Sequence, residues 1–136
     1  MPLPPSSDQP ASAALPSQAA GNELAVLDLR VLEEMVGSEP EVVRDFLQQY
    51  LASARNIMAE VRLGHATGDL ARVGGATHRL KSSSRAVGAL RFGDLCAQIE
   101  SAATRMQAEE VSASIPALEL AFVAVESAVA QHLGTS

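Results

Sequence analysis

The stretch from Gly74 to Glu100 decides both the fold of this chain and its chemistry. It reads Gly74-Gly75-Ala76-Thr77-His78-Arg79-Leu80-Lys81-Ser82-Ser83-Ser84-Arg85-Ala86-Val87-Gly88-Ala89-Leu90-Arg91-Phe92-Gly93-Asp94-Leu95-Cys96-Ala97-Gln98-Ile99-Glu100. Apolar residues recur in it every three or four positions, which predicts helices. The glycine at position 88 predicts a tight turn between two of them.

One histidine of this stretch lies away from the predicted core. If residues 69–87 form one helix, the core face is a single stripe of Leu70, Val73, Thr77, Leu80, Ser84 and Val87. The neighbours of His78 on its own face are Ala71, Gly74, Gly75, Lys81, Ser82 and Arg85. Most of these are Gly, Ala or Ser, so no bulky side chain shields the imidazole. Each interior glycine costs a helix about 1 kcal/mol relative to alanine. The pattern therefore keeps the imidazole accessible at the expense of helix stability.

An exposed imidazole flanked by cations is suited to accept a phosphoryl group. Lys81 and Arg85 favour the neutral, nucleophilic form of the ring, because a second positive charge nearby is unfavourable. The same two cations can offset the charge of an incoming phosphate.

The stretch also resembles the histidine phosphotransfer (HPt) domain of bacterial phosphorelays. That family has roughly His-x-Leu-Lys-Gly-(Ser/Ala)-Ser, then Gly-Ala, and later Leu followed by Cys-x-x-Leu-Glu. The matching residues here are His78-Arg79-Leu80-Lys81-Ser82-Ser83-Ser84, Gly88-Ala89 and Leu95-Cys96-Ala97-Gln98-Ile99-Glu100. The resemblance covers roughly residues 25–133.

The resemblance implies a function and assigns roles to residues. His78 would be phosphorylated at Nε2 by a receiver-domain aspartate and would pass the group to another such aspartate, with Lys81 as the supporting cation. The receiver would bring its own Asp and Mg²⁺, and this chain would bind no cofactor. The family's usual glycine is Ser82 here, which bears on how closely a partner's backbone approaches. We add the hypothesis that Ser82 donates a hydrogen bond or orients the ring.

The expected docking surface is the His78 face. It combines a patch of small residues, Ala71, Gly74 and Gly75, with a basic rim of Arg79, Lys81 and Arg85. Between positions 70 and 93 the sequence has five basic residues and no acid, which suits an acidic, phosphate-bearing partner. The alternative is that this cluster has no binding role and is simply a solvated helix face.

Composition limits the class of protein. The chain has 136 residues, enough for one core, and only 3% aromatic residues, which suits closely packed helices. The net charge of −6 argues against general nucleic-acid binding. The single cysteine fits a reducing compartment. The sequence shows no apolar run as long as a membrane span and no signal peptide, so we expect a cytoplasmic protein without membrane contact. We also expect a monomer, because a closed bundle with polar outer faces leaves no obvious apolar seam.

The rest of the chain predicts an all-α, up-down-up-down antiparallel four-helix bundle with a short additional N-terminal helix. Residues 1–24 read as a flexible Pro/Ala/Ser-rich segment, 25–133 as the bundle and 134–136 as a frayed tail. Asp28 should cap the short helix and Gly37 should end it. A capping box of Ser38 and Glu41 should start the next helix, which should end near Leu63. Asp69 should cap the helix that carries His78. Residues 109–113 read as a loop or a frayed helix start, with Ser114 and Pro116 marking the last helix.

Other chemistries fit less well. No His-x-x-x-His or Glu-x-x-His pair is present, so a metal site is not predicted. There is no Gly-x-x-x-x-Gly-Lys phosphate loop and no room for an ATP-binding domain, so His78 should receive phosphate from a phospho-aspartate on a receiver domain. A sensor histidine kinase is the other expected partner. A rival from another class remains, a helical interaction module that regulates a partner without phosphoryl transfer, and Ser82 is the feature that favours it.

Overall fold

The computed structural model describes residues 24–134, and this part of the chain forms five helices and no strand. They are α2 (Leu29–Val36), α3 (Pro40–Thr67), α4 (Leu70–Val87), α5 (Leu90–Thr104) and α6 (Ala108–Gly134). Except for residue 24, the predicted flexible segment 1–24 lies outside the described residues, and so do positions 135–136 of the predicted tail.

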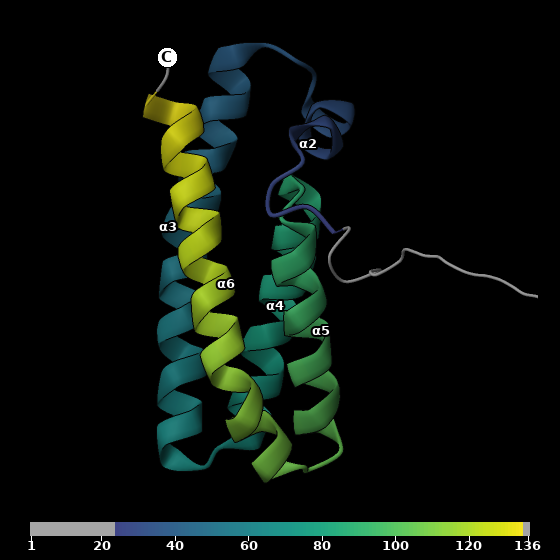
Figure 1. Cartoon of the computed structure of the whole chain (residues 1–136), viewed down its shortest axis with the longest axis vertical. Helices are drawn as coiled ribbons and strands as arrows, with labels where there is room; N and C mark the ends of the chain where they lie inside the picture. The colour runs from purple at the N-terminus through teal and green to yellow at the C-terminus, as the bar shows by residue number, and fades with distance from the viewer. Residues whose placement is uncertain (1–23, 135–136) are drawn as a thin grey trace, which may run out of the picture.

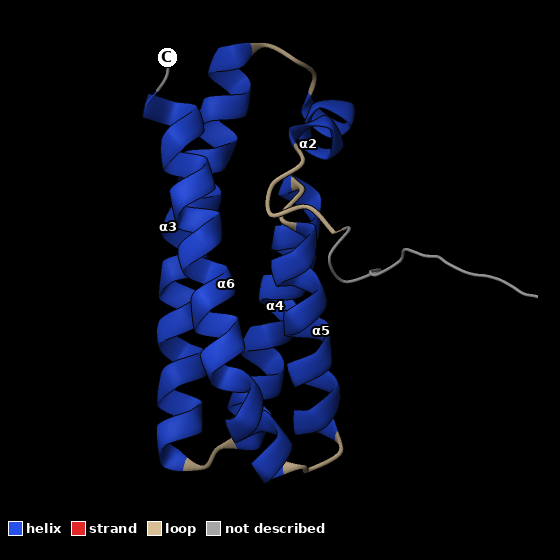
Figure 2. Ribbon diagram, in the orientation of Figure 1, coloured by secondary structure: helices blue, strands red, loops and turns tan. Residues whose placement is uncertain are grey.

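The four long helices form an antiparallel bundle. Figure 1 shows α3 beside α6 and α4 beside α5, with α2 at the end where α3 begins and α4 ends. Short turns join successive long helices, as Figure 2 shows in tan. At one end of the bundle, Arg44 Nη1 of α3 donates to the Leu133 carbonyl of α6 at 3.1 Å. The prediction of an all-α bundle with one short extra helix is confirmed.

The predicted core stripe of α4 is confirmed, except that Leu70 is only half-buried. Val73, Leu80 and Val87 are buried, and the two polar members of the stripe have partners. The Thr77 hydroxyl donates to the Val73 carbonyl at 2.8 Å. The hydroxyls of Tyr50 and Ser84 share a hydrogen bond of 2.7 Å. Because both polar groups are satisfied inside the helix or across to α3, α4 can bury this whole face.

Helix starts are set by caps, two of which the sequence predicted. The carboxylate of Asp28 accepts from the Arg30 N–H at 3.1 Å, and that of Asp69 accepts from the Arg72 N–H at 3.0 Å. The predicted capping box at Ser38 is wrong. Glu39 is the N-cap of α3 and makes no side-chain cap hydrogen bond. Pro40, whose missing N–H costs nothing at the first helical position, begins that helix.

Two helix ends also differ from the prediction. α3 continues past Gly64 to Thr67, because Gly64 is buried against α4 and a Cβ there would meet Val73 Cγ2 at 3.0 Å. The packing thus compensates for the low helix propensity of glycine. α6 begins at Ala108 and runs through Pro116, with Glu109 and Glu110 in its first turn, where acids are favourable. Val111, predicted as loop, is fully buried and holds these turns on the core.

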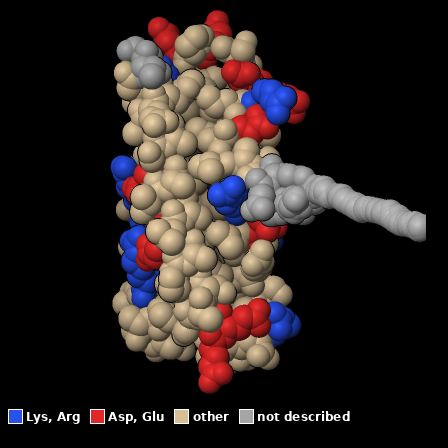
Figure 3. Space-filling model, viewed as in Figure 1, with Lys and Arg blue, Asp and Glu red and all other residues tan. Residues whose placement is uncertain are grey.

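The last helix is more apolar than the sequence analysis recognised. α6 is long and apolar enough to cross a membrane by length and composition alone. In the bundle, its carboxylates Glu119 and Glu126 pair with Arg62 and Arg55 of α3 at 2.7 and 2.8 Å. Because these acids turn towards α3, the side of the molecule seen in Figure 3 shows few charged side chains along α6.

The turn between α4 and α5 depends on Gly88. This residue has φ +89°, and a Cβ there would overlap the carbonyl of Asp28. Its own carbonyl accepts from the Asp28 N–H at 2.8 Å. Arg91 N–H likewise donates to the Ala25 carbonyl at 2.9 Å. Backbone hydrogen bonds therefore hold the chain before α2 against the α4–α5 turn.

Replacing Gly88 by alanine should destabilise the domain more than the same change at Gly68. Both glycines are left-handed helix caps, but at Gly68 a Cβ would meet nothing within 4 Å. Gly68→Ala should therefore cost only the backbone strain, about 1–2 kcal/mol. Gly88→Ala should cost roughly 3–5 kcal/mol, because the chain before α2 must also move. Urea unfolding followed by circular dichroism measures both, and equal losses would contradict this account of the turn.

Candidate functional site

The His78 imidazole lies on the outside of α4 and is held at one nitrogen. Its side chain is 58% exposed, and Nδ1 lies 2.8 Å from Glu100 Oε2 of α5. An ionised carboxylate can only accept a hydrogen bond, so Nδ1 carries the proton in this contact. In the neutral ring, Nε2 then carries the lone pair. The contact thus fixes both the tautomer and the orientation of the ring.

Glu100 also binds the predicted supporting cation. Lys81 Nζ lies 2.7 Å from Glu100 Oε1, and both side chains are 23% exposed. The hydrogen bond from Lys81, helped by the one from His78, lowers the pKa of the Glu100 carboxyl below its usual value, against a smaller effect of burial. Glu100 is therefore ionised at neutral pH. Sequence reasoning gave it no role, although it is the final residue of the motif Cys-x-x-Leu-Glu that carried the resemblance.

A shallow hollow beside His78 contains the predicted small residues. It is lined by Leu70, Ala71, Gly74, Gly75, His78, Glu100, Ala103 and Thr104. Neither glycine is required by the bundle. A Cβ at Gly75 would meet nothing within 4 Å, and one at Gly74 would make an ordinary 3.6 Å contact with Ala103. The hollow is thus wider than packing demands, at a cost in helix stability.

The predicted basic rim is less positive in the folded chain than in the sequence. Arg79 is paired with Glu60 of α3 at 2.7 Å, and Lys81 is paired with Glu100. Both acids come from other helices. The third rim residue, Arg85, lies over α5, where a Cβ at Gly93 would meet its Cγ at 3.0 Å. The exposed side chain of Arg85 has no ion pair with any residue in the described range 24–134.

The remaining predicted site residue, Ser82, lies one turn after His78 and is exposed. No side-chain hydrogen bond joins it to another residue of the described chain, whereas the ring of His78 is held by Glu100. The structure therefore brings together His78, Lys81 and the three small residues, and it leaves Ser82 exposed at the surface.

Other candidate chemical groups lie elsewhere. His65 Nε2 is 2.9 Å from Ser112 Oγ, at the junction of α3 and α6. Cys96 is fully buried, and burial raises the pKa of its thiol to about 12, so it is an unreactive core residue. Among residues 24–134 no group of three or more His, Cys, Asp or Glu side chains is placed to hold a metal ion.

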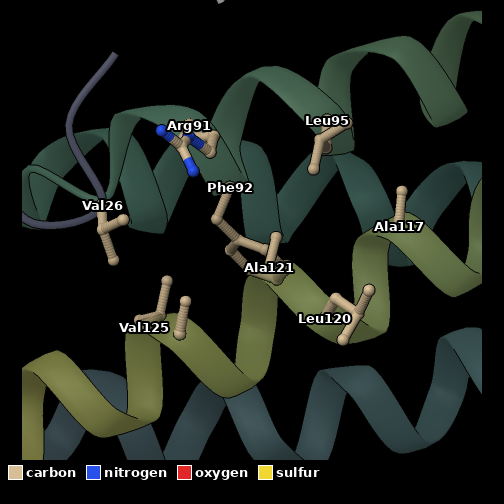
Figure 4. A pocket seen from close by; sticks show the side chains of 9 residues that line it. Val26, Arg91, Phe92, Leu95, Ala117, Leu120, Ala121 and Val125 are labelled. Carbon is tan, nitrogen blue, oxygen red and sulfur yellow. The ribbon is translucent and has the colours of Figure 1, made fainter. Parts of the chain in front are cut away.

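A second hollow lies between α5 and α6 (Figure 4). Its lining is apolar, from Phe92 and Leu95 on one side and Leu120, Ala121 and Val125 on the other, with Arg91 at the edge. It contains no nucleophile and no carboxylate, so it offers no site for group transfer.

Comparisons with known proteins bear on the family and the fold. A family model described as "Hpt domain" matches residues 45–133, more than half of the chain. Among solved structures, histidine-containing phosphotransfer protein B (HptB) from Pseudomonas aeruginosa PAO1 matches with a TM-score of 0.75 at 21% identity, over 82% of this chain and 96% of that one. No curated protein matches the chain. The chain therefore belongs to the Hpt domain family, the histidine phosphotransfer modules of phosphorelays.

Proposed function

We propose that His78 is the residue through which this Hpt domain works as a phosphorelay intermediate. Nε2 of His78 takes a phosphoryl group from an aspartate of one receiver domain and gives it to an aspartate of another. The observation that carries this proposal is the 2.8 Å contact between Nδ1 and Glu100. It leaves Nε2 as the nucleophile on a side chain that is 58% exposed.

The transfer needs little covalent machinery from this chain. Phosphoryl transfer proceeds through a loose transition state, so positioning and charge stabilisation do most of the work. Glu100 positions the ring, while Lys81 and Arg85 supply positive charge on the same side of α4. The receiver contributes its aspartate and Mg²⁺, and a sensor histidine kinase supplies phosphate to that receiver. This chain requires no cofactor of its own, and we expect it to act in the cytoplasm as a monomer.

The docking surface is the hollow beside His78. Ala71, Gly74 and Gly75 form its small-residue wall. Because the bundle would accept larger side chains at both glycines, their small size is best explained by a partner that must come close. Arg79 is at the edge of this surface and is already paired with Glu60, so we assign it a weaker electrostatic role than Arg85, which has no ion pair among residues 24–134.

Replacing His78 by glutamine should abolish phosphoryl transfer without unfolding the bundle, because His78 is outside the core. The test mixes the full chain with a phosphorylated receiver and Mg²⁺ and follows acid-labile, base-stable phosphate. The matched control is His65→Gln, which alters a half-buried histidine at the α3–α6 junction and should transfer normally. If the wild-type chain binds a receiver but takes no phosphate from any of a panel, the interaction-module alternative, favoured by Ser82, replaces this proposal.

Replacing Gly75 should separate stability from function. Gly75→Ala should raise the free energy of unfolding by about 1 kcal/mol, since alanine is the better helix former and has open space there. Gly75→Gln should slow transfer from a receiver at least tenfold, because its side chain fills the hollow. Ala130→Gln, at an exposed position of α6, is the matched control and should leave transfer unchanged. Normal transfer in Gly75→Gln would place the docking surface elsewhere.

A further inference from the structure

One carboxylate joins the nucleophile to the supporting cation. Glu100 Oε2 accepts from His78 Nδ1 at 2.8 Å, while Oε1 binds Lys81 Nζ at 2.7 Å. A neutral acceptor would be enough to orient the ring. The negative charge adds an electrostatic attraction, which should be largest when the ring is positively charged.

We propose that Glu100 keeps the proton on Nδ1 of His78 while Nε2 carries the phosphoryl group, and that this keeps the phosphohistidine a fast donor. The inference rests on the proposed function of His78. It concerns the reactivity of the phosphorylated state, which orientation of the ring alone does not set.

The bonds and charges of the transfer show where Glu100 acts. In the forward step the lone pair of Nε2 forms a bond to phosphorus, and the bond from phosphorus to the aspartate oxygen breaks with its electron pair on that oxygen. No proton moves. The ring now has a bond at Nε2 and a proton at Nδ1, so it is a cation. In the return step an aspartate oxygen attacks phosphorus, and the electrons of the N–P bond return to Nε2.

The leaving group of the return step decides its rate. A ring protonated at Nδ1 leaves as neutral imidazole, whereas a ring without that proton would leave as an anion, which is far less favourable. A carboxylate at 2.8 Å favours the protonated ring through a charge-assisted hydrogen bond, about twice as strong as a neutral one. Repulsion between Glu100 and the phosphoryl oxygens adds to this effect by raising the energy of the phosphorylated state.

The surrounding charges limit this effect without cancelling it. On α4, Lys81 neutralises part of the Glu100 charge and Arg85 lies one turn further on. The third cation of α4, Arg79, is bound to Glu60 of α3. On α5, Glu100 faces the ring. The other residues that line the hollow are uncharged. The ion pair with Lys81 thus limits how strongly Glu100 stabilises the proton on Nδ1 of His78.

The variant Glu100→Gln isolates the effect of the negative charge, because the amide oxygen can still accept a hydrogen bond from the Nδ1–H of His78. The full chain, labelled with ¹⁵N-histidine, is phosphorylated by a receiver and purified away from it. The ¹⁵N shift of Nδ1 is then followed against pH, and the return of phosphate to fresh receiver with Mg²⁺ is timed. In Glu100→Gln the Nδ1 proton should be lost at least one pH unit lower than in the wild type. Return at neutral pH should be about tenfold slower.

Two further variants complete the test. Glu126→Gln removes the same charge from the ion pair with Arg55 between α6 and α3 and should behave as the wild type in both measurements. Glu100→Ala removes the acceptor as well as the charge. If Glu100→Gln is as fast as the wild type and only Glu100→Ala is slow, Glu100 merely orients the ring and the inference is overturned. If the wild-type chain is not phosphorylated at His78, the proposed function itself fails, and this inference fails with it.

Discussion

The packing of α4 between α3 and α5 is the constraint on which the rest of the structure depends. α4 makes its most extensive contacts with these two helices, and it buries the stripe from Val73 to Val87 between them. His78 lies just off that stripe. The helix that is most firmly fixed in the bundle therefore carries the proposed nucleophile, and α5 brings Glu100 to the same place. A reactive side chain on a rigid element can be positioned more closely than one on a loop.

The parts of the site that follow from local periodicity could be predicted from sequence. The exposure of His78, the core stripe and the small residues around the imidazole all depend on a helical repeat of 3.6 residues. The role of Glu100 could not be predicted in this way. Glu100 is 22 residues from His78 in the sequence, and the two side chains meet only because α4 and α5 pack together. The basic rim was overestimated for the same reason, since Glu60 and Glu100 come from neighbouring helices.

The helix ends also show that local sequence patterns do not predict the effect of tertiary contacts. Gly64 reads as a break, yet tight packing against Val73 keeps α3 helical there. Val111 reads as part of a loop, yet its burial extends α6. In both places tertiary contacts outweigh a local preference of about 1 kcal/mol. The caps at Asp28 and Asp69 were predictable, because a cap is completed within three residues.

The central claim is that His78 is the phosphorylated residue and that Glu100 directs the phosphoryl group to Nε2. The most direct measurement is a ¹⁵N–³¹P correlation spectrum of the chain, labelled with ¹⁵N-histidine and phosphorylated by a receiver domain. The account predicts one coupled nitrogen, Nε2 of His78, with the proton retained on Nδ1. Phosphate on Nδ1 of His78, or on His65 or His132, would contradict it.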